Sequence, residues 1–253
     1  RSTLFPYTTL FRSSYDTSLY DYYFIIHASQ FDSVNPWTVT ATLGVDSASD
    51  TVIIDSADEY DIELSYLLPV EYQLVEYLES TGGQYINSGH NITANDYVEI
   101  HGQLTATQAS NEFCGVSTTA GGARFLIQGS NANKIEFNNG TSVLTSSAVS
   151  LNTDLVISVG SQFKVNGSVV NNSTIKANTR PLYLFGENNL GTAGSFGKVR
   201  IQYMLIQTNG VTQREFYPCY RKADSVAGLY DIQNGVFYTN LGTGAFVVGG
   251  DIN

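Results

Sequence analysis

Four Asn-Gly pairs punctuate the chain after residue 138 and separate runs of strand-forming residues. They lie at Asn139-Gly140, Asn166-Gly167, Asn209-Gly210 and Asn234-Gly235. Both residues of such a pair tolerate the positive φ angles that a two-residue β-hairpin turn requires. Each pair therefore predicts a two-residue hairpin, and together the four pairs favour an antiparallel β fold.

The segments around these turns have the two-residue periodicity of β-strands. In residues 97–104, for example, Val98 and Ile100 alternate with Tyr97 and Glu99, so that apolar side chains share one face. Further runs of this kind occupy residues 124–128, 134–137, 154–159, 181–185 and 198–206. One or two helical turns are expected only in residues 71–79. Many short strands joined by Gly-rich turns predict an all-β sandwich or jelly roll.

A smaller β domain is expected before these strands. Apolar residues alternate with threonines from Trp37 to Leu43, and a second alternating run spans residues 60–66. Several strands within about fifty-five residues favour a small antiparallel sandwich, incomplete at its start. Pro69 ends the last of these strands. The expected boundaries are therefore 14–68 for the small domain, 69–72 for a linker and 73–253 for the larger domain.

The first thirteen residues, RSTLFPYTTLFRS, differ in character from the rest of the chain. They contain a near-repeat of TLF and have neither helical nor strand periodicity. Residues 3–13 resemble the in-frame translation of a widely used short-read sequencing adapter. We therefore predict that residues 1–13 are an artefact that contributes nothing to the fold, and that they pair with no sheet.

The charge balance argues against two classes of partner. Lys and Arg number 12 and Asp and Glu number 23, which gives a formal net charge of −11. Such a chain does not neutralise the phosphates of nucleic acid or an anionic membrane surface. No apolar run approaches the length of a membrane span. Charged residues make up only 14%, so the surface is mostly uncharged and polar, as in many extracellular β proteins.

The cysteines and the candidate catalytic residues point away from disulfide-rich and enzymatic classes. Cys114 and Cys219 are too few for a disulfide framework, so two separate buried thiols are favoured, with pairing left open. A glycosidase needs two carboxylates that flank the bond, and no Glu-x-Asp-x-Glu-like run exists. No histidine stands in a nucleophile motif or at metal-ligand spacing. We therefore expect no catalytic residue and no enzyme.

Three separated segments carry a resemblance to a known family. They are VEYLESTGGQYINSG at 75–89, PLYLFGENNLGTAGSFGKVRIQYMLI at 181–206 and EFYPCYRKADSVAGLYDIQNGVFYTNLGTGAF at 215–246. Together they resemble the laminin-G-like, concanavalin A-like jelly rolls of gut bacterial and phage surface proteins. The resemblance implies two antiparallel sheets of six or seven strands each and no established catalytic residue. Residues 37–66 resemble the closing strands of immunoglobulin-like repeats on such proteins.

The resemblance also bears on metal and cofactor use. Laminin-G-like domains often hold one calcium ion at the rim of the sandwich through carboxylates, amides and carbonyls. The family's usual acidic residue in QYIDTG is Asn87 in this chain. This replacement weakens the calcium site. Asp96, Glu187 and Asp231 stay open as single calcium ligands, but isolated acidic residues are mostly solvated surface groups, so we assign no metal and no cofactor.

The best candidate for a ligand-binding segment is the loop GENNLGTAGSFG, residues 186–197. It offers one aromatic ring with amide and carboxylate groups, the combination that binds a pyranose. Loops on a rigid scaffold are also where binding residues concentrate. The predicted ligand-binding residues are Glu187, Asn188, Asn189 and Phe196.

A second cluster, within FYPCYRKADSVAGLYD, is predicted to close the fold. Its members are Cys219, Tyr220, Arg221, Asp224 and Asp231. We expect Pro218 to break a strand here, and Arg221 to pin the crossing by pairing with a partly buried Asp224 or Asp231. The alternative is an exposed Tyr-Arg-Lys patch that binds an acidic glycan.

The sequence thus favours a non-catalytic module that binds a glycan or a host-surface receptor. We expect it outside the cell, on a bacterial surface or in a phage tail, within a larger assembly. The alternative is a spacer or decoration domain of such an assembly that binds no small ligand.

Overall fold

The structure is a computed structural model that describes residues 68–118 and 122–252, together with the backbone of four strands nearer the N-terminus. The chain divides into two compact units, Arg1–Glu63 and Leu64–Asn253. The predicted linker at residues 69–72 falls within the second unit, where Tyr72 begins a strand.

The first unit contains two separate hairpins. Strand β1 (Thr8–Arg12) pairs antiparallel with β2 (Tyr23–His27), and β3 (Trp37–Leu43) pairs antiparallel with β4 (Asp46–Val52). The predicted strand at Trp37 is confirmed. The expectation that residues 1–13 pair with no sheet is wrong, because Thr-Thr-Leu-Phe-Arg is rich in β-branched and aromatic residues that favour strands.

The predicted adapter origin of residues 3–13 and the immunoglobulin-like assignment stay predictions. The predicted strand at residues 60–66 lies outside the described residues.

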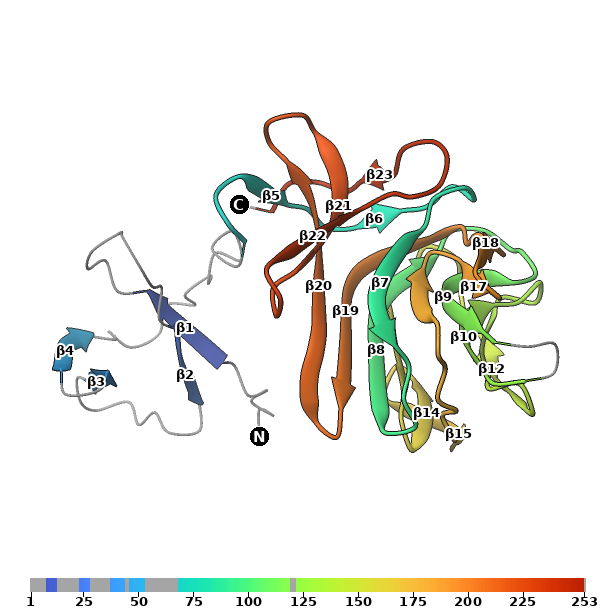
Figure 1. Ribbon diagram of the computed structural model, residues 1–253, viewed down its shortest axis with the longest axis horizontal. Helices are drawn as coiled ribbons and strands as arrows, with labels where there is room; N and C mark the ends of the chain where they lie inside the picture. Colours follow the sequence, from blue (N-terminus) through green and yellow to red (C-terminus); the bar gives the residue numbers. More distant parts are fainter. Residues whose placement is uncertain are drawn as a thin grey trace. The chain divides into compact units, whose positions relative to one another are not determined.

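The second unit is an all-β arrangement of two sheets (Figure 1). The eight-stranded sheet contains β7 (Ile86–Asn91), β9 (Asn111–Ser117), β10 (Arg124–Gly129), β11 (Lys134–Asn138), β12 (Val143–Ala148), β16 (Pro181–Leu184), β17 (Glu187–Asn189) and β18 (Thr192–Gly194). The eleven-stranded sheet contains β5 (Tyr72–Leu74), β6 (Leu78–Glu79), β8 (Asp96–Leu104), β13 (Leu155–Val159), β14 (Gln162–Val165), β15 (Ser168–Asn172), β19 (Val199–Thr208), β20 (Val211–Arg221), β21 (Val226–Asp231), β22 (Val236–Thr239) and β23 (Val247–Val248).

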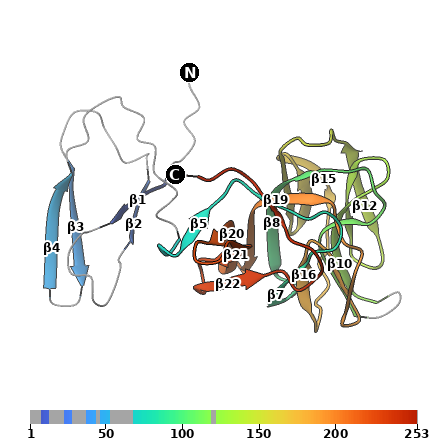
Figure 2. The same cartoon turned by 90° about the horizontal axis from the view of Figure 1, so that it is seen from above.

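The sheets have more strands than the six or seven expected from the family resemblance. Continuous paths run β12-β11-β10-β9-β16-β7 in one sheet and β15-β14-β13-β8-β19-β20-β21-β22 in the other. Short strands at the edges raise the totals. Pairing is antiparallel except between β17 and β9, which run parallel. Figure 2 shows β22 beside β20 and β21, the group that closes the second sheet.

No helix occurs in the part of the chain that the structure describes, and thus none long and apolar enough to cross a membrane. The expected helical turns at residues 71–79 are therefore wrong. Tyr72–Leu74 pairs with β20 and Leu78–Glu79 pairs with β19. Pairing with sheet strands satisfies the backbone of this segment, and an isolated turn of helix is too short to compete.

The core lies between the sheets and is built from Val, Leu and Ile side chains together with phenylalanines. The fully buried phenylalanines are Phe113, Phe125, Phe137, Phe163, Phe185 and Phe216. Phe137 of the first sheet lies 6.3 Å, centroid to centroid, from Phe163 of the second. The strands alternate as their sequences predict: in β8 the even-numbered residues are buried and the odd-numbered ones are half-buried. One face of each sheet is therefore free to carry polar and aromatic side chains.

All four Asn-Gly pairs lie in hairpin loops, and two of them form the predicted two-residue turn. Asn166-Gly167 joins β14 to β15 and Asn209-Gly210 joins β19 to β20, with positive φ at both residues of each pair. Asn139-Gly140 and Asn234-Gly235 instead lie within four-residue loops. In the first of these loops the Asn139 Oδ1 atom accepts hydrogen bonds from the backbone N–H groups two and three residues ahead, which widens the turn.

Candidate functional site

The four predicted ligand-binding residues belong to one hairpin and its exit. Glu187 and Asn189 are the first and last residues of β17, which pairs with β18 and lies beside β9. Glu187 and Asn188 are buried, Asn189 is exposed and Phe196 is half-buried. The structure therefore brings the four residues together but gives them different surroundings.

Asn188 holds the hairpin rather than facing solvent. Its Nδ2 donates to the Pro181 carbonyl at 2.9 Å, and its Oδ1 accepts from Gly191 N at 2.9 Å. Leu190 and Gly191 form the turn with φ angles of 57° and 96°. A leucine at positive φ is unusual, so these hydrogen bonds stabilise a turn that its own residues disfavour. Asn188 therefore positions the site.

Two tyrosines that the sequence analysis missed complete an aromatic surface with Phe196. The rings of Tyr85 and Tyr183 stack with centroids 4.9 Å apart and planes at 28°, and Phe196 lies 6.0 Å from Tyr85. All three side chains are half-buried. We call Tyr85, Tyr183 and Phe196 the platform. Tyr183 lies between Leu182 and Leu184, which enter the core, so strand alternation places its ring on the outer face.

Polar groups surround the platform. Asn87 of β7 lies opposite Tyr183 in the sheet register, and Gly115 of β9 lies on its other side. Ser195 Oγ donates to Glu187 Oε2 at 3.3 Å. The outer face of this sheet thus combines stacked rings with amide, hydroxyl and carboxylate groups.

A buried carboxyl group, Glu112 of β9, lies close to this face. Only 1% of it is exposed, and its Oε2 has no hydrogen-bond partner among the described residues. Burial raises the pKa of Glu112 well above its ordinary value, and the charges of Glu187 and Glu136 raise it further, against the opposing charge of Arg124. Burial therefore favours the neutral form of the Glu112 carboxyl over its charged form.

Glu112→Gln should increase stability at neutral pH. The folded pKa of Glu112 is raised, so above 4.5 the folded state binds more protons than the unfolded state and stability falls as the pH rises. The fall is about 1.4 kcal/mol per pH unit until the folded group ionises. Glutamine keeps the shape and cannot ionise. Denaturant melts from acid to neutral pH should show a flatter profile for the variant.

The matched control for this experiment is Glu136→Gln. Glu136 is half-buried on β11 and accepts a hydrogen bond from Gln128 at 2.9 Å. Glu136→Gln should change the slope of stability against pH less than Glu112→Gln does. A Glu112→Gln protein that is less stable than the parent at neutral pH would contradict the buried neutral carboxyl.

A second aromatic surface lies on the other sheet, but its polar groups satisfy one another. Tyr203 and Tyr217, with centroids 5.2 Å apart, both donate to Glu215 Oε1, at 3.1 and 3.2 Å. His101 Nε2 lies 2.9 Å from Glu99, which also accepts from Tyr97. Burial raises the pKa of Tyr97 to about 12, and the hydrogen bond to Glu99 adds to the rise. This surface offers fewer free polar groups than the platform.

The predicted structural cluster is only partly assembled as expected. Cys219 is buried and free, as is Cys114. Tyr220 donates to Asp251 at 3.2 Å. Arg221 pairs with Asp224 at 2.6 Å, but 40% and 43% of these side chains are exposed, so the expected half-buried pair is not present. The short turn after β20 keeps Asp224 at the surface.

Pro218 does not break the strand. It lies inside β20, at the point where β20 stops pairing with β19 at Phe216 and begins pairing with β5 at Cys219. The β20–β21 ladder continues through Pro218, which lies opposite Leu229. The Pro218 carbonyl accepts from Val75 N on the other side, where the partner changes, so the missing N–H removes no hydrogen bond to β21 and the strand tolerates the proline. The predicted crossing point is therefore present without a break.

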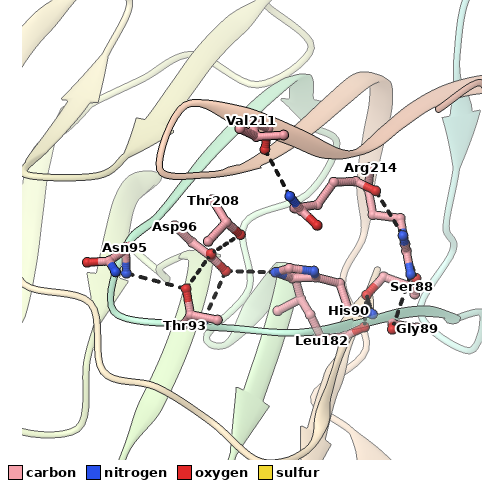
Figure 3. A network of polar contacts seen from close by, with 11 residues as sticks. Ser88, Gly89, His90, Thr93, Asn95, Asp96, Leu182, Thr208, Val211 and Arg214 are labelled. Carbon is pink, nitrogen blue, oxygen red and sulfur yellow. Dashed lines mark hydrogen bonds and ion pairs between the residues drawn. The ribbon is translucent and has the colours of Figure 1, made fainter.

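Asp231, the last member of the cluster, pairs with an arginine that the sequence analysis did not single out. It is completely buried, and its Oδ2 lies 3.5 Å from Arg214 Nε. Arg214 also donates to the carbonyls of Ser88 and Gly89 on β7, at 3.1 and 3.3 Å (Figure 3). Since β20 and β7 belong to different sheets, Arg214 links the two sheets.

A second buried acid makes the same kind of link. Asp96, at the start of β8, accepts hydrogen bonds from Thr93 and from Thr208, and lies 2.7 Å from His90 Nε2 on β7 (Figure 3). Burial alone would raise the pKa of Asp96, but these hydrogen bonds outweigh it and the pKa is lowered. We call Asp96, His90, Arg214 and Asp231 the inter-sheet clamp.

The residues left open for calcium do not come together. The Asp96 oxygens are occupied by protein donors, and Asp231 is paired with Arg214. Asn87 Oδ1 accepts from Gly89 N at 3.0 Å. Across residues 68–118 and 122–252, no group of three or more His, Cys, Asp and Glu side chains is arranged to hold a metal ion.

Fold and site together define a class: an all-β two-sheet protein with a rigid aromatic and polar surface on one sheet. No protein-family profile matches the chain, and no curated protein sequence matches it. One similar solved structure is described as a "putative carbohydrate binding protein" from Bacteroides ovatus. It has a TM-score of 0.49 and 9% sequence identity over 88% of this chain and 72% of that chain. Likeness at this level supports no conclusion about function, which rests on the residues of this chain.

Proposed function

We propose that the second unit is a non-catalytic carbohydrate-binding module whose ligand stacks on the platform. The observation that carries the proposal is the stacked pair Tyr85–Tyr183, extended by Phe196 on the same outer face. Sugar sites commonly place aromatic rings against the apolar face of a pyranose and polar groups around its edge. A rigid sheet and a hydrogen-bonded hairpin hold these rings in place.

The polar edge of such a site is present at the platform. Asn189 is exposed at the hairpin turn, and Asn87 is half-buried beside Tyr183. Amide groups donate and accept at once, which suits the mixed hydrogen bonding of sugar hydroxyls. Glu187 is buried, and its Oε2 accepts a hydrogen bond from Ser195 Oγ. Glu187 therefore orients the loop that carries Phe196.

The wider setting belongs to the same proposal. An acidic chain with few charged residues and many polar ones fits display outside the cell, on a bacterial surface or a phage virion, where a glycan or a host receptor is the partner. The proposal assigns no cofactor and no catalytic residue. The alternative of a spacer without ligand remains distinct, because it predicts no glycan binding at all.

Tyr183→Ala should weaken glycan binding at least about tenfold, which corresponds to about 1.4 kcal/mol. The variant removes one ring of the stacked pair, whereas Tyr183→Phe keeps the ring and should bind nearly as tightly as the parent. The measurement is a screen of the full chain on a glycan array, followed by calorimetric titration with the oligosaccharides that bind.

Tyr220→Ala is the matched control, because Tyr220 lies on the other sheet and donates a hydrogen bond to Asp251. It should leave binding unchanged. If Tyr183→Ala binds every glycan as tightly as the parent, the platform is not the site. A parent chain that binds no glycan on the array would favour the spacer.

A further inference from the structure

Two of the five arginines in the described residues have no ion-pair partner there. The other three are neutralised in the pairs Arg200–Glu79, Arg214–Asp231 and Arg221–Asp224. Arg124 and Arg180 lie within 4.0 Å of no carboxylate in this part of the chain. In a protein with 23 acidic residues and 12 basic ones, unpaired arginines are exceptions that invite an explanation.

Arg180 lies at the edge of the platform. It directly precedes β16, which carries Tyr183. Burial raises the pKa of Tyr183, and the positive charge of Arg180 opposes this rise, so the two side chains are within electrostatic reach. A Cβ atom on Gly191 would lie 2.8 Å from Arg180 Nη1, so the glycine at the hairpin turn leaves room for the guanidinium group.

Arg124 is connected to the same hairpin through paired residues on neighbouring strands. It is opposite Ser117 on β9, and Ser117 is in turn opposite Asn189 on β17. Its Nε is buried and has no hydrogen-bond partner among the described residues. Burial disfavours the charged form of the neighbouring Glu112 carboxyl, so the pKa of Glu112 is raised despite the charge of Arg124. Two arginines that form no ion pair within the described residues therefore flank the hairpin turn.

We infer that the ligand of the platform is an acidic sugar, a pyranose that carries a carboxylate. The inference rests on the proposed function and names its substrate class. Arg180 binds the carboxylate, Arg124 adds positive charge, and the rings of Tyr85 and Tyr183 hold the pyranose. A guanidinium group matches a carboxylate with two parallel N–H···O hydrogen bonds, a geometry that neutral sugars do not use. Arg221, which belongs to the alternative acidic-glycan patch of the sequence analysis, is paired with Asp224.

The test compares uronic acid oligosaccharides with their methyl esters, which keep the sugar ring but lack the negative charge of the carboxylate. Trimers of galacturonate, glucuronate and mannuronate are titrated into the full chain. At least one acid should bind tenfold or more tightly than its ester, and added salt should weaken the acid alone. Arg180→Met removes the charge at similar length and should abolish the preference for the acid. Arg124→Met should reduce it.

Arg221→Met is the matched control and should keep the preference, and melting temperatures of all variants verify folding. The inference is overturned if no acid binds more tightly than its ester, or if folded Arg180→Met keeps the preference. If Tyr183→Ala still removes binding in that case, the platform remains the sugar site and only the acidic class is lost. If Tyr183→Ala changes nothing, the proposed function fails as well.

Discussion

Arg214→Ala should lower the free energy of unfolding by about 3 kcal/mol, whereas Arg221→Ala should leave it almost unchanged. Removing one partner of a buried ion pair costs about 3–5 kcal/mol, because the other charge is left without compensation. Asp231 is 0% exposed and Arg214 only 19%, so this pair is of the buried kind. In the variant Asp231 still accepts hydrogen bonds from Glu215 N, Gln233 N and Asn234 Nδ2. We therefore expect a loss of stability at the lower end of this range.

Arg221 is the matched comparison, since the same substitution there removes an ion pair that is closer still, at 2.6 Å against 3.5 Å. Its pair with Asp224 is exposed, and exposed pairs contribute little because water and salt screen them. Denaturant melts of the two variants measure both effects. Equal losses would mean that burial does not decide how much these pairs stabilise the fold. A harmless Arg214→Ala would show that the inter-sheet clamp does not stabilise the fold.

Much of the fold follows from patterns that are local in sequence. Strand alternation correctly placed residues 97–104 within β8 and, except for Lys198, residues 198–206 within β19. Positive φ at Asn166-Gly167 and Asn209-Gly210 is a property of those two residues themselves. Such signals need no knowledge of distant partners. At residues 71–79 the prediction fails because tertiary pairing overrides local preference.

Only the part of the candidate site that is contiguous in sequence could be predicted. The hairpin from Glu187 to Phe196 is one stretch of sequence, so its composition suggested a loop with binding groups. Tyr85 and Tyr183 are nearly a hundred residues apart and meet only because β7 pairs with β16. Alternation in Pro-Leu-Tyr-Leu does indicate that Tyr183 faces away from the core. What it stacks against depends on sheet order, which one sequence does not reveal.

The arginine pairings show the same limit. Arg221 and Asp224 are three residues apart and meet across a turn, whereas Arg214 reaches Asp231 across the β20–β21 ladder. Composition predicted an arginine–aspartate pair in this segment but could not decide which aspartate is buried. Burial depends on the strands that cover each side chain. Asp231 is covered because β21 is flanked by β20 and β22, whereas Asp224 lies in the loop before β21.

Asp96→Ala is expected to lower the free energy of unfolding by about 3 kcal/mol at neutral pH. The carboxylate is buried and accepts hydrogen bonds from Thr93 N, from two threonine hydroxyls and from the His90 ring. Each buried donor that loses its acceptor costs about 1–3 kcal/mol, and not all four can turn to water. Asp96→Asn should cost less, because its oxygen can still accept from His90 and Thr93 N while its amide donates to the hydroxyls.

The contribution of Asp96 should also depend on pH in a defined direction. Its folded pKa lies below the ordinary value of 3.8, so the unfolded state takes up a proton first as the pH falls. The stabilisation by the charged form is therefore complete above the unfolded pKa and is lost as the pH falls through the folded pKa. The difference in stability between the parent and Asp96→Asn should shrink as the pH falls below about 4, where Asp96 takes up its proton. Urea melts at a series of pH values below this point measure the difference. A difference that grows as the pH falls below about 4 would contradict an ionised Asp96 in the inter-sheet clamp.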